Sequence, residues 1–214
     1  METQIRTLTR TMSDTTEQHR VDHLSREFRQ QVKNRQEDHS VYALTLSATE
    51  SFVRNNIGWW DIDARERFIE GLFSLLIHRV SSRCCSNYRR DTHQDRRILS
   101  LGFIEHYSRE TGELVQPHIH ATLAVHNQWE DQFESCFQRN LCRDHYSVRP
   151  EVFSGNALTR WEEQVESLRL ELIPTNNDQF RWISYSSKQI PTDLTDGCSF
   201  LHQGIRRRTD NASL

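Results

Sequence analysis

Two histidines separated by a single residue are the pattern in this sequence best suited to chemistry. His118 and His120 lie in the stretch PHIHATL. Alternate residues of a β-strand face the same side, so both imidazoles would project from one face about 7 Å apart along the backbone. Two neutral imidazoles in that arrangement can bind one metal ion. Since the chain contains 11 histidines, a third ligand on the same face is needed to distinguish a site from a chance pattern.

A predicted β-hairpin contains this histidine pair. Two apolar-rich stretches, residues 99–107 and 114–125, are separated by a short polar segment. Thr111 and Gly112 in that segment favour a tight turn, because glycine adopts the backbone conformations that such turns require. We therefore predict two antiparallel strands joined by a two-residue turn.

The turn sets the register of the two strands, and the register supplies the third ligand. With a two-residue turn, Glu105 lies directly opposite His118, and cross-strand neighbours share a face of the sheet. Glu105, His118 and His120 would then form a two-imidazole, one-carboxylate site for a divalent cofactor, Mn²⁺ or Mg²⁺. A three-residue turn would move Glu105 to the opposite face. Pro117 adds a condition, because it requires its strand to be locally unpaired or bulged.

A tyrosine and a lysine near the end of the chain form a second candidate pair. Residues 178–190 are predicted to form a helix whose apolar residues fall on one side: Phe180, Ile183 and Ile190. Tyr185 and Lys188, three residues apart, share the other side and project together. Only two of the 27 basic residues are lysines, so Lys188 indicates a position that needs a compact positive charge.

Two predicted elements precede the hairpin. Residues 41–48, VYALTLSA, are typical of a short buried strand. From Asp61 onward, apolar residues recur at intervals of three and four, as on one face of a helix that covers a sheet: Ile69, Leu72, Phe73, Leu76 and Val80.

Further elements follow the hairpin. Asn127 with Glu130 resembles a capping box for a helix with four large apolar residues: Trp129, Phe133, Phe137 and Leu141. Strands are predicted at residues 146–153 and 168–172, with a helix at 156–166 between them. We therefore expect an α/β (α+β) fold with a central, mostly antiparallel sheet of about five strands, flanking helices, and the histidines on a central strand.

Composition bounds the organisation of the chain. With 214 residues, 35% of them hydrophobic and 27% charged, we expect one domain at residues 40–190. A partly disordered tail and helix at 1–39 would precede it, and an extension at 191–214 would follow. No apolar run approaches the roughly 18 residues of a membrane span, and the start lacks the apolar stretch of a signal peptide. We expect no membrane partner, reduced cysteines, and a cytoplasmic protein, or a nuclear one in a eukaryotic host.

Local basic segments stand out against a net charge of -3. Residues 81–97 and 206–208 are rich in arginine, which could contact the phosphates of a nucleic acid. A charge run of this kind is usually solvated surface, and the alternative is that its arginines bind phosphates: Arg83, Arg89, Arg90, Arg96 and Arg97.

The order of these motifs resembles that of the HUH endonucleases, particularly the single-tyrosine initiators of rolling-circle replication. YALTLSA matches the first motif of the family, PHIHATL its histidine motif and YSSK its tyrosine motif. Together they span residues 41–188. The sequence departs from the family in the long stretch between residues 50 and 99, and it lacks the helicase domain of many viral initiators.

The resemblance implies a reaction and a set of partners. Tyr185 would attack a phosphodiester of single-stranded DNA at an origin or hairpin, leaving a 3′-hydroxyl and a 5′-phosphotyrosyl enzyme. Glu105, His118 and His120 would hold the metal, and Lys188 would position the phosphate. Duplex DNA would require a host helicase or prior melting. If Tyr185 is not the nucleophile, Tyr107 is the next candidate.

Other classes of protein remain open from the residues alone. A single-tyrosine transposase would use the same chemistry. His120-Ala-Thr122 and His145-Tyr-Ser147 fit the pattern of metal-independent two-histidine phosphoesterases, although 25 residues is a short separation for two halves of such a fold. A non-catalytic nucleic-acid-binding module would keep the histidines for structure only. Zinc binding by Cys136, Cys142 and His145 competes with simple packing of the cysteines.

Overall fold

The computed structural model describes residues 38–85, 98–108, 111–140, 145–174 and 200–203, together with Arg26, Glu27, Gln30, Lys33, Asn34, Asp178, Arg181 and Trp182. Of residues 200–203, only the backbone is described.

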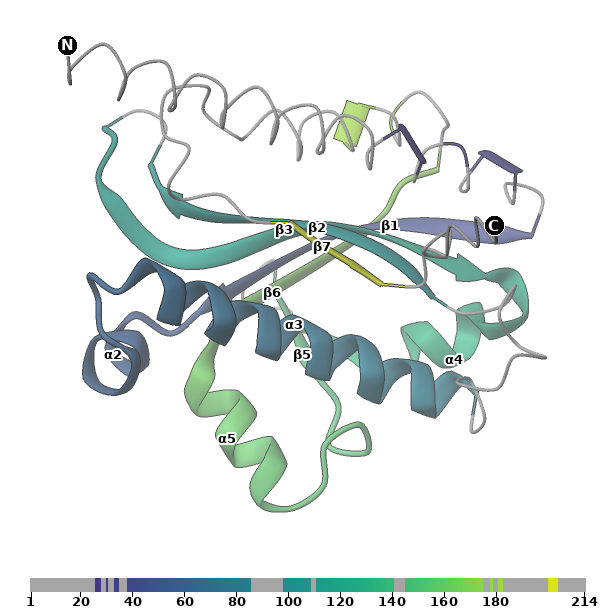
Figure 1. The fold of residues 1–214 in the computed structure, drawn as a ribbon. Helices are drawn as coiled ribbons and strands as arrows, with labels where there is room; N and C mark the ends of the chain where they lie inside the picture. Colours follow the sequence, from purple (N-terminus) through teal and green to yellow (C-terminus); the bar gives the residue numbers. More distant parts are fainter. Residues whose placement is uncertain are drawn as a thin grey trace, which may run out of the picture.

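An antiparallel β-sheet lies at the centre of these residues (Figure 1). In spatial order its strands are β6 (Val165–Leu172), β1 (His39–Ala48), β3 (Leu114–His126), β2 (Leu99–Tyr107) and β7 (Phe200–Gln203). All neighbouring strands are antiparallel. β3, which carries both histidines, lies between β1 and β2, so both of its edges are paired and its side chains are held firmly in place.

The helices α3 (Ile62–Cys84), α4 (Glu130–Glu134) and α5 (Asn156–Gln164) lie on the same side of this sheet in Figure 1. α3 begins where the side chain of Asp61 accepts a hydrogen bond from the backbone N–H of Ala64 at 2.9 Å, which satisfies one of the first-turn donors. The five apolar positions that predicted this helix are all buried. Between β1 and α3 lie α2 (Glu50–Phe52) and the π-helical turn η1 (Val53–Ile57).

The two faces of the sheet have separate apolar clusters. Side chains on the helix-covered face, such as Leu44, Ile119 and Leu123, pack with α3 in the larger core. Strand residues that point the other way, such as Ala43 on β1 and Phe103 on β2, belong to a smaller cluster on the opposite face. Because strand side chains alternate, Glu105, His118 and His120 project from this second face, away from α3.

The coarse expectation of a fold that mixes helices with an antiparallel sheet is confirmed. The helix predicted from Asn127 is largely wrong. A 3-10 turn, η3 (Asn127–Trp129), leads into α4, which ends at Glu134, and the next residues form strand β4 (Phe137–Asn140). Phe133 and Phe137 are both buried, with ring centroids 5.2 Å apart, so their spacing of four reflects a shared core rather than one continuous helix.

A second, two-stranded sheet pairs β4 with β5 (His145–Val148). The strand predicted at 146–153 therefore ends early. Its pairing stops before Pro150, which has no N–H to donate to a sheet, and Val152 N–H instead closes a turn onto the carbonyl of Arg149 at 2.9 Å.

The ends of the chain are described only in part. Asp178, Arg181 and Trp182 have helical backbone, and the rest of the predicted helix at 178–190 lies outside the described residues. β7, in the region expected to be a C-terminal extension, pairs with β2. None of the described helices is long and apolar enough to cross a membrane.

Candidate metal centre

Glu105 on β2 and two histidines on β3 form a compact group of potential metal ligands. One ligand atom from each of Glu105, His118 and His120 lies within 4.8 Å of the other two. Oε2 of Glu105 is 2.8 Å from Nε2 of His118 and 3.7 Å from Nε2 of His120. The three side chains are 12 to 19% exposed. Two imidazoles and a carboxylate at this separation suit a divalent ion that keeps open coordination positions.

The predicted pairing of Glu105 with His118 is confirmed, but the predicted two-residue turn is wrong. Tyr107 pairs with Leu114, and Ser108 N–H bonds the carbonyl of Glu113 at 2.8 Å. The register at the turn is therefore displaced by two residues from the register at the site.

An irregularity in β3 reconciles the two registers. Between the Glu105–His118 and Tyr107–Leu114 pairs, β2 contributes one residue, His106, and β3 contributes three, residues 115–117. Pro117 lies inside this bulge, as its missing N–H requires. Because the displacement is two residues rather than one, every side chain keeps its face, and Glu105 remains beside the histidines.

Hydrogen bonds to Nδ1 orient both imidazole rings. The carbonyl oxygen of Gln116 lies 3.1 Å from Nδ1 of His118, and the hydroxyl of Thr45 lies 2.9 Å from Nδ1 of His120. Thr45 is directly opposite His120 on β1. Contacts of this kind fix the tautomer and the ring angle of metal-binding histidines and direct Nε2 toward the ion.

The protonation states of Glu105 and His118 depend on each other. Burial acts to raise the pKa of Glu105, but hydrogen bonds with His118 and His120 outweigh it and lower the pKa to about 2. Burial acts to lower the pKa of His118, but its hydrogen bond with Glu105 outweighs burial and raises that pKa. Glu105 is therefore a carboxylate at neutral pH, and a metal must displace the proton that it stabilises on His118.

A buried arginine supports the bulge. Arg65 in α3 is fully buried, donates a hydrogen bond to the carbonyl of Trp59 at 2.9 Å, and donates another to the carbonyl of Val115 inside the bulge. Burial lowers the pKa of Arg65 to about 10, so it stays charged at neutral pH. This arginine was not predicted from the sequence, although its position four residues before Ile69 on the apolar face of the helix was a signal.

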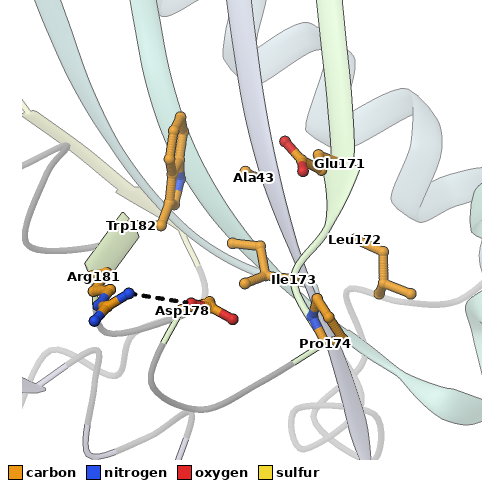
Figure 2. Close-up of a pocket in the computed structure, with 8 residues that line it drawn as sticks. All are labelled: Ala43, Glu171, Leu172, Ile173, Pro174, Asp178, Arg181 and Trp182. Carbon is orange, nitrogen blue, oxygen red and sulfur yellow. Dashed lines mark ion pairs between the residues drawn. The ribbon is translucent and has the colours of Figure 1, made fainter.

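A tryptophan shortly before the proposed nucleophile also contacts the site. The ring centroids of Trp182 and His120 are 5.9 Å apart, and the indole N–H of Trp182 donates to the carbonyl of Ala121 at 3.1 Å. Trp182 also lines a cavity of about 400 Å³ beside Ile173 (Figure 2). Asp178 and Arg181 in that cavity pair with each other at 3.9 Å, and Glu171 is a third charged residue that lines it.

The other predicted site residues are distributed as follows. Most of them lie outside the described residues: Tyr185, Lys188, Arg89, Arg90, Arg96, Arg97 and residues 206–208. Arg83 is exposed in the last turn of α3. Cys136 is buried and its thiol donates to the carbonyl of Gln132 at 3.2 Å, which favours packing over the zinc alternative. Cys142 also lies outside the described residues.

The two-histidine phosphoesterase pattern is not brought together in one sheet. His120 is at the centre of the large sheet, whereas His145 is on β5 and pairs with Asn140 in the small sheet. This arrangement disfavours that alternative, which requires two equivalent histidine strands side by side.

Comparison of the chain with family models, curated proteins and solved structures found no match. The fold and the site themselves define an α+β protein with an antiparallel sheet. A candidate divalent-metal cluster lies on the face of that sheet that α3 does not cover.

Proposed function

We propose that this protein is a metal-dependent endonuclease that nicks and rejoins single-stranded DNA, an HUH-type initiator of rolling-circle replication. The observation that carries the proposal is the cluster of Glu105, His118 and His120 on adjacent central strands. It combines the ligand set that suits a divalent ion with partial burial and an adjoining cavity of about 770 Å³.

The residues of the chain have distinct roles in this proposal. Glu105, His118 and His120 would hold the ion, with Thr45 and Gln116 orienting the rings. When bound, a divalent ion supplies positive charge that stabilises the nonbridging oxygens of a scissile phosphate. The surrounding side chains limit access of water to the cluster, which strengthens such electrostatic interactions.

Tyr185 would supply the nucleophile. Its phenol loses its proton to solvent and the oxygen forms a bond to phosphorus as the bond from phosphorus to O3′ breaks, and the leaving O3′ takes up a proton. The strand then ends in a 3′-hydroxyl, and the 5′-phosphate stays on the tyrosine. Attack by a 3′-hydroxyl on this phosphotyrosine reverses the step and rejoins DNA. Lys188 would stabilise charge on the phosphate.

The contact of Trp182 with β3 supports this assignment. Trp182 bonds to the backbone beside His120, and Tyr185 follows it by three residues in the sequence. Three residues of chain span at most about 11 Å. Tyr185 is therefore only three residues along the chain from a side chain that contacts the metal cluster, whereas Tyr146 belongs to the small sheet.

A covalent capture experiment tests the proposal. The protein is incubated with circular single-stranded DNA and Mn²⁺, and denaturing gels are examined for protein linked to DNA. We expect a linked species that EDTA prevents and that Tyr185→Phe cannot form, while Tyr185→Phe still binds DNA. Lys188→Ala should form the adduct more slowly.

Two outcomes would overturn the proposal. Covalent attachment of Tyr185→Phe would remove Tyr185 from its role and direct attention to Tyr107, which lines the same cavity as the cluster. DNA binding without adduct under any divalent metal would instead indicate a non-catalytic nucleic-acid-binding module. The transposase alternative differs only in its substrate, so strand transfer between two cleaved hairpins would favour it.

A further inference from the structure

The cavity beside the metal cluster extends to an arginine that is paired with a glutamate. Glu105, His118 and His120 line one part of it, and Arg54 and Trp59, from the segment between β1 and α3, line another. Among the described residues around this cavity, Arg54 is the only arginine or lysine. A volume of about 770 Å³ is in the range of sites that bind small ligands or parts of larger ones.

The side chain of Arg54 is held in place by two neighbours. Its Nε donates to the carboxylate of Glu50 at 2.7 Å, and its guanidinium carbon lies 3.8 Å from the ring centroid of Trp59. Trp59 is only 9% exposed and also contacts the guanidinium of Arg65 at 4.7 Å. A guanidinium that stacks on a buried ring loses little further freedom when it binds a ligand.

The remaining donors of Arg54 suit a phosphate. The bond to Glu50 uses Nε, and the terminal amino groups bond to no described residue. The side chain is 48% exposed. A planar guanidinium with two terminal amino groups available binds a phosphodiester through paired hydrogen bonds.

An exposed tryptophan follows directly in the sequence. Trp60 is 79% exposed and is one of three large hydrophobic residues that are exposed among those described. An exposed indole, one residue along the chain from the cavity residue Trp59, is suited to stacking against a nucleobase. Only an unpaired base can offer its face in this way, which favours a single strand over a duplex.

We propose that Arg54 and Trp60 bind single-stranded DNA next to the metal cluster, with Arg54 on a backbone phosphate and Trp60 against a base. The inference deepens the proposed function, because it assigns the path of the strand that the metal cluster would cleave. Arg54 and Trp60 are binding residues in this account, and neither contacts the metal ligands in the cluster.

Binding of a labelled oligonucleotide tests both residues. The probe is a fluorescein-labelled dT12, titrated with the full chain in Mg²⁺ at several salt concentrations and followed by anisotropy. Arg54→Gln should weaken binding and reduce the salt slope by about 0.7, the value for one phosphate contact on a single strand. Trp60→Ala should weaken binding roughly tenfold and leave the slope unchanged.

Matched variants control for nonspecific effects. Arg67→Gln removes an exposed arginine of α3 that does not line the cavity, and Leu75→Ala removes a partly exposed apolar side chain of the same helix. Both should bind dT12 as the parent does. Mn²⁺ binding, measured by calorimetry, should be the same in Arg54→Gln, Trp60→Ala and the parent protein.

The possible results separate this inference from the proposed function. Unchanged dT12 affinity in both Arg54→Gln and Trp60→Ala overturns the inference, even when the parent nicks circular DNA. Equal affinity of the parent for a duplex hairpin overturns the single-strand assignment. Loss of binding in both variants when the parent forms no covalent adduct supports the inference and removes the nuclease proposal.

Discussion

Arg65 and Val115 are joined by a hydrogen bond from a buried guanidinium to a backbone carbonyl within the bulge of β3. The bulge contains the two extra residues that bring His118 opposite Glu105. A bulge leaves ladder groups without their usual partners, and Arg65 supplies a donor for one of them. The helix on one face of the sheet thereby supports the ligand geometry on the other face.

Replacing Arg65 should therefore weaken metal binding without touching a ligand. Arg65→Met removes the donor to Val115 and should raise the Kd for Mn²⁺ about tenfold, a typical effect of residues that orient ligands. Arg65→Lys, which keeps the charge and one donor group, should recover part of the affinity. Calorimetry well below the unfolding temperature measures both.

Arg67→Met is the control for the Arg65 variants, since Arg67 is exposed on the same helix. It should bind Mn²⁺ like the parent protein. Parental affinity in Arg65→Met would show that the bulge keeps its shape without the arginine.

Thr45 offers a more direct test of ring orientation. Thr45→Val has nearly the same shape but cannot hydrogen bond to Nδ1 of His120. We expect the Kd for Mn²⁺ to rise about tenfold and the electron paramagnetic resonance spectrum of bound Mn²⁺ to broaden as the ligand geometry becomes less uniform. Thr49→Val is the matched control, because the side chain of Thr49 makes no capping hydrogen bond to α2. A parental spectrum and Kd for Thr45→Val would contradict the role of Thr45.

The residues of the candidate metal site could be predicted from the sequence, whereas the length of the turn between their strands could not. The pairing of Glu105 with His118 follows from face alternation, which a displacement of two residues preserves, so a wrong turn still gave the right neighbours. Pro117 was the visible sign of the bulge. The size of the bulge depends on contacts with Val115 from a helix 50 residues away, and local patterns carry no information about such a contact.

The same limit explains the elements that were predicted well or poorly. The five apolar residues that predicted α3 are all buried, and an aspartate caps the helix, so local signals agree with its packing. The segment after Asn127 also has helical spacing, but pairing with β5 converts Phe137 into a strand residue. Arg65 was missed because arginines are rarely buried.

A side chain at Gly102 should crowd Ile119 in the core beneath the histidine strand. A Cβ at this position would lie 2.6 Å from Cδ1 and 3.0 Å from Cγ1 of Ile119, the buried residue between His118 and His120. Gly102→Ala should lower the free energy of unfolding by about 1 to 3 kcal/mol, the usual effect of overpacking a core. Urea denaturation measures the change.

A second substitution distinguishes this clash from other effects of alanine at position 102. Ile119→Val removes Cδ1, the nearest clashing atom. The double variant Gly102→Ala, Ile119→Val should lose less stability than the sum of the two single variants. Strict additivity would mean that Ile119 is not the source of the strain.

Metal affinity should depend on pH through His118. Its hydrogen bond with Glu105 outweighs burial and raises its pKa, so below that pKa the metal must displace a proton from Nε2. The apparent affinity for Mn²⁺ should therefore fall by up to about tenfold per pH unit on the acidic side of the His118 pKa and level off on the basic side.

Glu105→Gln removes the charge that raises this pKa, so the fall in affinity should begin at lower pH. Binding at high pH should also be weaker, because an anionic ligand is lost. His145→Gln, a change outside the cluster, should leave the profile of the parent unaltered. Calorimetric titrations from pH 5.5 to 8 provide the comparison, and a Glu105→Gln profile with the parental midpoint would show that Glu105 does not control protonation of the site.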